Sequence, residues 1–259
     1  MDSSSHDNMS FLEHLEELRW HIIRSLIAII SAGFICFLMK DFIFDTIIFG
    51  PKKMDFPTYK FLCQAATFIG VETTFCGDEF PFIVQNRTMA GQFSAHVMTS
   101  IISGFIISFP YILYEFWKFI SPGLLEKEKA KSRGFIFVSS MLFFIGVLFG
   151  YYIISPLSIN FLGTYQVSSQ VLNEIDLGSF ISLVRSSAIA SGIIFELPII
   201  IYFLTKAGVV TPESLVKYRK YALVLVLVLA AIITPPDVAS QIIVAIPIVV
   251  LYQVSIFIS

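Results

Sequence analysis

The stretch Ser10-Phe-Leu-Glu-His-Leu-Glu-Glu-Leu-Arg-Trp-His-Ile-Ile-Arg24 decides how the rest of the chain is interpreted, because a charged helix runs here without a break into an apolar span. Its apolar residues recur on one helical stripe, which is typical of an amphipathic helix. Ser10 with Glu13 forms a capping-box pattern and predicts the helix start. The acidic residues Glu13, Glu16 and Glu17 lie on the other side. Acidic residues do not hold a helix against an anionic leaflet, so a basic ligand is one possible reason for them.

Composition places the chain among polytopic α-helical membrane proteins. Of its 259 residues, 56% are hydrophobic and 14% charged, and the mean hydropathy is +0.81. Soluble domains are about a quarter charged. The alternating segments of a transmembrane β-barrel do not occur in the sequence, and a net charge of −2 gives no electrostatic case for nucleic acid. The polar start lacks a basic region and a cleavage site, so the first apolar span is expected to remain as an anchor.

The apolar segments predict an all-α fold with six transmembrane helices in one integral membrane domain covering residues 1–259. The predicted spans are about 20–39, 93–117, 133–155, 179–204, 220–233 and 238–258. The long mixed segment 41–92 is expected to form a small outer cap, and Pro110 is expected to kink the second span. The fifth span is short: its apolar part, from Tyr221 to Ile233, would be ~20 Å long against a hydrocarbon core of ~30 Å.

Lysine and arginine predict the orientation. They are frequent in the segments on the side of the amino terminus, whereas the short loops on the opposite side have none and the remainder lie in the long first loop. The positive-inside rule therefore favours six spans with both termini in the cytoplasm. We find no sequence repeat between the two halves, which counts against an inverted-repeat transporter.

Motifs for enzymatic chemistry are missing from the sequence. It contains no phosphate-binding G-x-x-x-x-G-K-S/T loop, no H-E-x-x-H and no G-x-S-x-G, so the chain is not expected to be an enzyme or to need a cofactor or metal. The four histidines, His6, His14, His21 and His96, are scattered and are interpreted as solvated or interfacial.

Three cysteines occur, and they divide into two kinds. Cys36 lies in an apolar run and is interpreted as a buried small hydrophobic residue. Cys63 and Cys76 flank a polar segment, match no zinc-binding spacing, and would form a disulfide if their loop faced an oxidising compartment. The sequence leaves that bond open.

Glu196 is the notable polar residue inside a span. A carboxylate at membrane depth is costly, so it should be protonated, paired or hydrated. Pro198 removes a backbone donor and frees the Ile194 carbonyl, which predicts a polar notch. Arg185 lies ~16 Å away along the helix, too far for a direct pair, and nearer the outer surface. Glu196 is either a water-accessible functional carboxyl or a neutral group bonded between helices.

Two acidic clusters precede spans on the cytoplasmic side. One contains Glu13, Glu16 and Glu17, and the other contains Glu126 and Glu128 among lysines. They are either ordinary solvated charge or two parts of one pocket for a basic peptide. Arginine binds carboxylates through paired hydrogen bonds that lysine cannot copy, so two acids would let a site demand two consecutive arginines.

Four blocks of sequence, in order, resemble the TatC family, the signal-peptide receptor subunit of the twin-arginine protein translocase. Phe11–Arg19 is similar to the family's H-L-x-E-L-R motif, and Pro110–Leu124 to its P-x-I/L-L-Y-x-x-W-x-F-I/V-x-P-A/G-L block. Phe195-Glu-Leu-Pro198 is similar to its F-E-L/V-P element. Thr234-Pro-Pro-Asp237, followed by Ser240-Gln241, is similar to its T-P-P-D turn.

The resemblance implies site residues. Glu17 and Glu128 would contact the arginine pair of a signal peptide, with Arg19 and Phe119 shaping that site. Glu196 and Gln241 would form a polar patch on the concave face of a curved helical wall, whose fifth and sixth helices are short. Pro51 would belong to the structured outer cap. Pro110, Pro198 and Asp237 would be structural.

The resemblance also implies the assembly and its location. The chain would sit in the bacterial inner membrane, bind twin-arginine signal peptides of folded precursors, and act with single-span TatA and TatB partners along spans five and six. More than one copy would join the complex, and the proton-motive force would drive transport. From the residues alone, two alternatives remain: a proton-coupled secondary transporter that uses Glu196, and a structural membrane scaffold.

Overall fold

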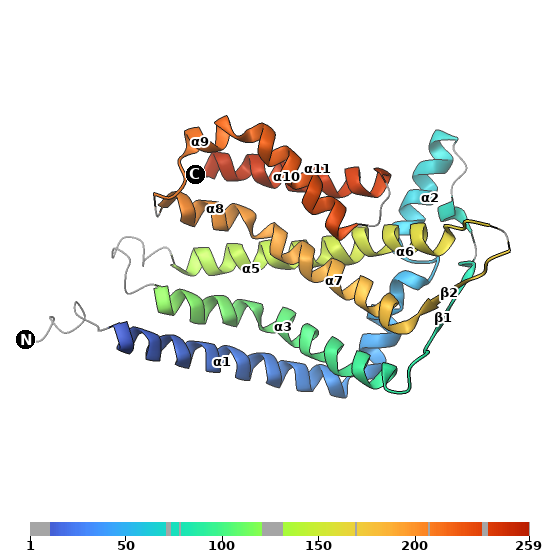
Figure 1. Ribbon diagram of the computed structural model, residues 1–259, viewed down its shortest axis with the longest axis horizontal. Coiled ribbons are helices and arrows are strands. Elements are labelled where there is room, and N and C mark those ends of the chain that lie inside the picture. The colour runs from blue at the N-terminus through green and yellow to red at the C-terminus, as the bar shows by residue number, and fades with distance from the viewer. Residues whose placement is uncertain are drawn as a thin grey trace, which may run out of the picture. The chain divides into compact units, whose positions relative to one another are not determined.

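The computed structural model describes residues 11–70, 74–77, 79–120, 132–168, 170–206, 208–234 and 238–258, and within them the chain is almost entirely helical (Figure 1). It divides into two compact units, one formed by residues 1–39 and 100–140 and the other by residues 40–99 and 141–259. Within the described part, five helices are long and apolar enough to cross a membrane. The all-α polytopic fold predicted from the sequence is therefore confirmed.

The first unit consists of α1 packed against most of α3 and the start of α5. α1 (Phe11–Leu38) joins the charged lead-in and the first span in one continuous helix, as predicted. α3 (Gly91–Ile120) runs through Pro110 without ending, and α5 begins at Ser132. The Ser108 hydroxyl donates to the Ala28 carbonyl of α1 at 3.0 Å, so the two helices approach closely in mid-span.

Two glycines make that close approach possible. A Cβ atom on Gly104 would lie 2.5 Å from the backbone nitrogen of Gly33 and 2.5 Å from the carbonyl oxygen of Ile29. Since association of membrane helices depends on van der Waals packing, small residues at the contact let the backbones meet. Gly104 and Gly33 therefore set the spacing of α1 and α3.

We expect Gly104→Ala to destabilise the protein by about 1–3 kcal/mol, because the added methyl group meets backbone atoms that cannot move aside without separating the helices. Gly134→Ala is the matched control, since a Cβ there has no neighbour within 4 Å. It should be neutral or stabilise the helix by up to about 1 kcal/mol. Thermal unfolding in detergent measures both; equal melting temperatures would contradict the packing role of Gly104.

The second unit contains the cap segment and the remaining helices. The cap (residues 41–92) holds η1 (Phe42–Ile48), η2 (Gly50–Lys52), α2 (Pro57–Ile69), η3 (Thr74–Cys76) and β1 (Phe82–Gln85). The helices that follow are α5 (Ser132–Phe149), η5 (Gly150–Ile154), α6 (Ser155–Thr164), α7 (Leu177–Phe195), α8 (Leu197–Lys206), α9 (Pro212–Lys217), α10 (Arg219–Ile233) and α11 (Val238–Ile258). A buried apolar cluster joins η5 to the α10–α11 pair through Ile154, Val226, Ala230, Val244, Ala245 and Ile248.

The third predicted span extends past its expected end at residue 155. The helix passes through the π-helical turn η5 and continues as α6 to Thr164, so part of the segment expected to be a loop is helical. Pro156 has no N–H and leaves the Tyr152 carbonyl without its helical donor. The Thr58 hydroxyl of the cap supplies that hydrogen bond. The sequence suggested a stop at Pro156 because the donor comes from a residue far away in the chain.

The cap is tied to the helices by tyrosine hydroxyls and by a small sheet. The fully buried Tyr59 hydroxyl lies 2.9 Å from the Pro51 carbonyl and 3.0 Å from the Pro156 carbonyl. Burial raises the pKa of Tyr59, so the hydroxyl stays a donor. β1 pairs in parallel with β2 (Asn173–Asp176), with Phe82 opposite Asn173. Figure 1 shows the pair at the same end of the molecule as α2. This sheet was not predicted.

Candidate functional site

A buried, hydrogen-bonded pair of side chains joins α1 to α3 in the first unit. The Nδ1 atom of His21 lies 2.6 Å from Oε2 of Glu115, and the two side chains are only 10% and 3% exposed. The residues are 94 positions apart in sequence. A carboxylate accepts hydrogen bonds and cannot donate them, so the proton in this bond belongs to Nδ1. The prediction that His21 is solvated or interfacial is therefore wrong, since a carboxylate partner on the neighbouring helix lets the ring be buried.

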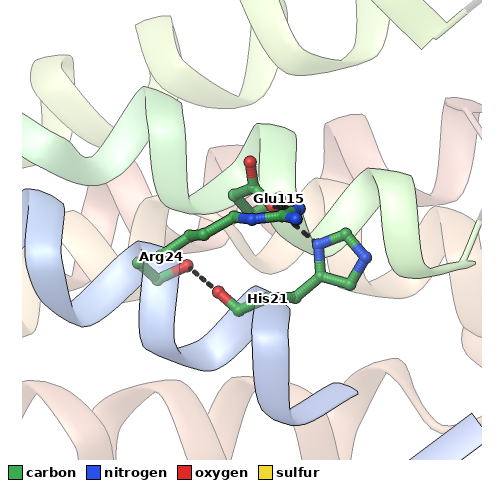
Figure 2. A network of polar contacts seen from close by, with 4 residues as sticks. His21, Arg24 and Glu115 are labelled. Atoms are coloured by element: carbon green, nitrogen blue, oxygen red, sulfur yellow. Dashed lines mark hydrogen bonds and ion pairs between the residues drawn. The ribbon is translucent and has the colours of Figure 1, made fainter. Parts of the chain in front are cut away.

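Further groups complete the environment of Glu115. Figure 2 shows the guanidinium of Arg24 reaching over toward the same carboxylate, and its Nη1 atom lies 3.6 Å from Oε2. The hydroxyl of Tyr111, one helical turn before Glu115, also interacts with this carboxylate. Glu115 thus gathers contacts from three residues, which offsets the cost of burying a carboxylate among apolar helices.

A small cavity opens next to this pair. Its volume is about 300 Å³ and it is lined by Glu17, Trp20, His21, Arg24 and Lys118. Glu17 and His21 are four residues apart on α1, so their side chains share one face of the helix. The volume is at the low end of ligand pockets, which suits one or two side chains of a peptide. The cavity is therefore lined both by the half-buried carboxylate of Glu17 and by the imidazole ring of His21.

The structure brings three of the predicted signal-peptide residues to this end of the unit. Glu17 lines the cavity. The Phe119 ring meets His21 edge-on, with 6.1 Å between the ring centroids. Arg19 is exposed and forms an ion pair with Glu16 at 3.1 Å, and its guanidinium carbon lies 5.8 Å from the ring centroid of Trp20, which lines the cavity. Glu128 lies outside the described residues.

The predicted intramembrane polar residues all lie in the second unit. Glu196 is only 8% exposed and caps the end of α7, and α8 begins at the next residue, Leu197, with Pro198 as its second residue. Gln241 donates from Nε2 to the Leu227 carbonyl at 3.1 Å, which ties α11 to α10. Its hydrogen bond therefore goes to α10 and not to Glu196. Arg185 is half-buried in α7, and Asp237 lies outside the described residues.

The residues predicted for the cap are buried or bonded. Pro51 is fully buried, and a disulfide joins Cys63 to Cys76 with 5.1 Å between their Cα atoms. Cys36 is a buried free thiol.

A larger cavity of about 1320 Å³ lies between the cap and the first residues of α3 and α7. It contains none of the predicted site residues, and its lysines and acids are of mixed sign, so the smaller cavity is the stronger candidate.

The pair His21–Glu115 was missed by sequence reasoning, although a signal was present. Glu115 stands in the apolar run Pro110–Ile120, and an acid in such a run needs a partner as much as Glu196 does. Only the packing of α1 on α3 identifies His21 as the partner.

The site can bind a cation that carries several hydrogen-bond donors. Glu17 provides a negative charge, and a neutral His21 provides a lone pair on the ring nitrogen that does not face Glu115. The two cations at the rim are turned to other groups: Arg24 approaches Glu115, and the Lys118 amine lies 5.1 Å from the Tyr114 ring centroid. In the described residues, no group of three or more His, Cys, Asp or Glu side chains could hold a metal ion.

Comparison with known proteins points to one family. Residues 13–247 match the family profile described as "Sec-independent protein translocase protein (TatC)". A protein of that name from Blattabacterium sp. subsp. Periplaneta americana is 47% identical over 254 residues, which covers 98% of this chain and 96% of the relative. One from Aquifex aeolicus is 37% identical and covers 96% of this chain and 94% of the relative.

Solved structures agree with the sequence comparison. A crystal structure described as the twin arginine translocase receptor TatC in DDM has a TM-score of 0.72 and 36% identity, covering 95% of this chain and 98% of the other. A second crystal structure of the same receptor has a TM-score of 0.68 and 34% identity. With 36% and 34% identity, these two structures resemble this chain in sequence as well as in fold.

Proposed function

This chain belongs to the TatC family of Sec-independent protein translocase proteins, and we propose that it is the subunit that receives twin-arginine signal peptides of folded precursors. One observation carries the proposal. The half-buried carboxylate of Glu17 lines a cavity on the face where α1 meets α3, beside a histidine fixed by a buried carboxylate. That cavity offers an arginine side chain both a charge and a hydrogen-bond acceptor.

In this proposal Glu17 binds one guanidinium of the arginine pair, and Glu128, which lies outside the described residues, binds the other. Phe119 supports the site through its contact with His21. Arg19 has an indirect role, since its ion pair with Glu16 removes a competing carboxylate from the surface near Glu17. In the acidic lead-in of α1, Glu17 is thus the carboxylate that binds the peptide, whereas Glu16 is engaged by Arg19.

The wider assembly follows from the family. The chain would lie in the bacterial inner membrane with both termini in the cytoplasm, and the proton-motive force would drive export. Single-span TatA and TatB partners would pack on α10 and α11, and several copies would join one complex. α10 supports this arrangement because its 15 residues span only about 22 Å, less than a normal bilayer core. A partner helix would shield such a short span from lipid mismatch.

The test is peptide binding to the full chain in detergent, with synthetic signal peptides that carry Arg-Arg or Lys-Lys. We expect Glu17→Gln to weaken Arg-Arg binding about 10- to 100-fold, because a charge-assisted hydrogen bond is worth about 1.5–3 kcal/mol. Lys-Lys should bind weakly to the wild type, and the substitution should change its affinity less.

Glu16→Gln is the matched control. Glu16 is the neighbouring residue, its side chain is 65% exposed, and it is engaged by Arg19. The substitution removes the same charge without touching the cavity, so it should change the affinity less than threefold at ordinary salt concentration. Equal losses in the two variants, or equal affinities of the wild type for Arg-Arg and Lys-Lys, would reject a specific receptor site at Glu17.

A further inference from the structure

His21 has two ring nitrogens, and within the described part of the chain only one is hydrogen-bonded. Nδ1 is bonded to Glu115, and no other described residue is hydrogen-bonded to Nε2. In Figure 2 this second nitrogen lies on the side of the ring away from Glu115. The side chain remains 10% exposed and lines the same cavity as Glu17. The ring therefore reaches the cavity with a nitrogen that can bind a ligand.

Glu115 decides which kind of nitrogen that is. Because the carboxylate accepts a hydrogen bond from Nδ1–H, a neutral His21 must carry its lone pair on Nε2. Nε2 is then a hydrogen-bond acceptor on the side of the ring away from Glu115. A carboxylate that orients a histidine in this way fixes both the tautomer and the ring angle, as it does for histidines that bind metals.

We infer that His21 is a specificity-determining residue of the signal-peptide site, where the Nε2 lone pair accepts a hydrogen bond from the arginine that is bound by Glu17. Glu115 is the positioning residue that keeps Nε2 an acceptor. This inference rests on the proposed function. A guanidinium has five N–H donors in a planar fork and can bond to Glu17 and His21 together, whereas the donors of a lysine all leave one nitrogen.

The charges around His21 predict how the affinity for the peptide changes when His21 is protonated. On α1 the ring faces Glu17 and Arg24, and on α3 it faces Glu115 and Lys118, with the Tyr111 hydroxyl behind Glu115. With His21 neutral, these four charged groups cancel. With His21 protonated, Nε2 becomes a donor and the site gains a positive charge, so it repels arginine. Protonation of His21 should therefore weaken binding.

Two substitutions separate the functions of the two nitrogens. His21→Asn places an amide N–H near the position of Nδ1 and can keep the bond to Glu115, but it removes the acceptor at Nε2. His21→Gln places an amide oxygen near Nε2 and does not titrate. At pH 8 we expect His21→Asn to bind the Arg-Arg peptide about tenfold more weakly than the wild type, and the Lys-Lys peptide with less than a twofold change. His21→Gln should bind Arg-Arg within threefold of the wild type.

The pH profile is a readout that a purely structural role would not change. When acid protonates His21, the Arg-Arg affinity of the wild type should fall about tenfold, while that of His21→Gln should stay nearly constant over the same pH range. His96→Gln, which changes a histidine in the second unit, is the control and should retain the fall of the wild type. Melting temperatures identify any variant that fails to fold, and the wild-type and His21→Gln profiles then decide.

The outcomes distinguish this inference from the proposed function. If Glu17→Gln weakens Arg-Arg binding while His21→Asn does not, or if His21→Gln keeps the full fall with acid, the role of His21 is overturned and the receptor stands. If Glu17→Gln also binds like the wild type, the receptor site itself is lost. A tenfold loss in His21→Asn together with a flat profile in His21→Gln supports both.

Discussion

Replacing Glu115 by leucine should destabilise the protein by about 2–4 kcal/mol, the largest effect that we expect from a single polar residue in the first unit. The leucine fills the space but removes the acceptor for Nδ1–H of His21, and a buried donor without a partner costs about 1–3 kcal/mol. Arg24 also loses its nearest carboxylate at 3.6 Å. Because the guanidinium of Arg24 is about half exposed and can turn to water, we do not expect the full cost of an isolated buried charge.

The double variant His21→Leu/Glu115→Leu makes this prediction specific to the pair. Replacing both partners by apolar groups leaves neither donor nor acceptor buried, so much of the stability should return. Glu174→Ala is the matched control, since the Arg87–Glu174 ion pair has a similar length of 3.0 Å but is 57% and 43% exposed. It should cost less than about 1 kcal/mol. Chemical unfolding in detergent measures all three variants. No recovery in the double variant would contradict a pairwise interaction.

Much of the fold followed from hydrophobic segments, because the bilayer leaves few choices for an apolar stretch of about 20 residues. The merging of the charged lead-in with the first span into α1, and the brevity of the fifth helix, were both predictable. The continuation to Thr164 was not, because it depends on the hydroxyl of Thr58 in the cap. The parallel pairing of β1 with β2 also joins two loops that are far apart in sequence, and no local pattern signals such contacts.

The candidate site, like the fold, could be predicted only in part from the sequence. Glu17 could be singled out from its acidic neighbours only through the family motif, since all three acids have the same local pattern. The structure adds a physical distinction: Glu16 is engaged by Arg19, whereas Glu17 lines the cavity. His21 could not be found from α1 alone, because a histidine at the end of a span is ordinarily interfacial. Its burial depends on a carboxylate that arrives 94 residues later.

Removing the disulfide of the cap should have the second large effect. The bond between Cys63 and Cys76 closes a loop with a sequence separation of 13 and connects α2 to η3. By the chain-entropy estimate, cross-linking a loop of about 15 residues contributes about 3 kcal/mol. We therefore expect Cys63→Ser/Cys76→Ser to unfold the cap at lower temperature and to speed protease cleavage between residues 57 and 77. Cys36→Ser is the control, because that cysteine is free and buried in α1.

The same bond tests the orientation of the chain in the membrane. Structural disulfides persist in oxidising compartments and are rare in the cytosol. If the cap faces outward, membranes that are denatured in the presence of an alkylating reagent should show one reactive thiol, that of Cys36. After reduction of the disulfide they should show three. The charge pattern of the short loops predicts this arrangement independently, because it places both termini in the cytoplasm. Three reactive thiols before reduction, in cells that retain an oxidised marker protein outside, would place the cap in a reducing compartment. The positive-inside prediction would then be wrong, and Glu17 would lie on the far side of the membrane from newly made precursors.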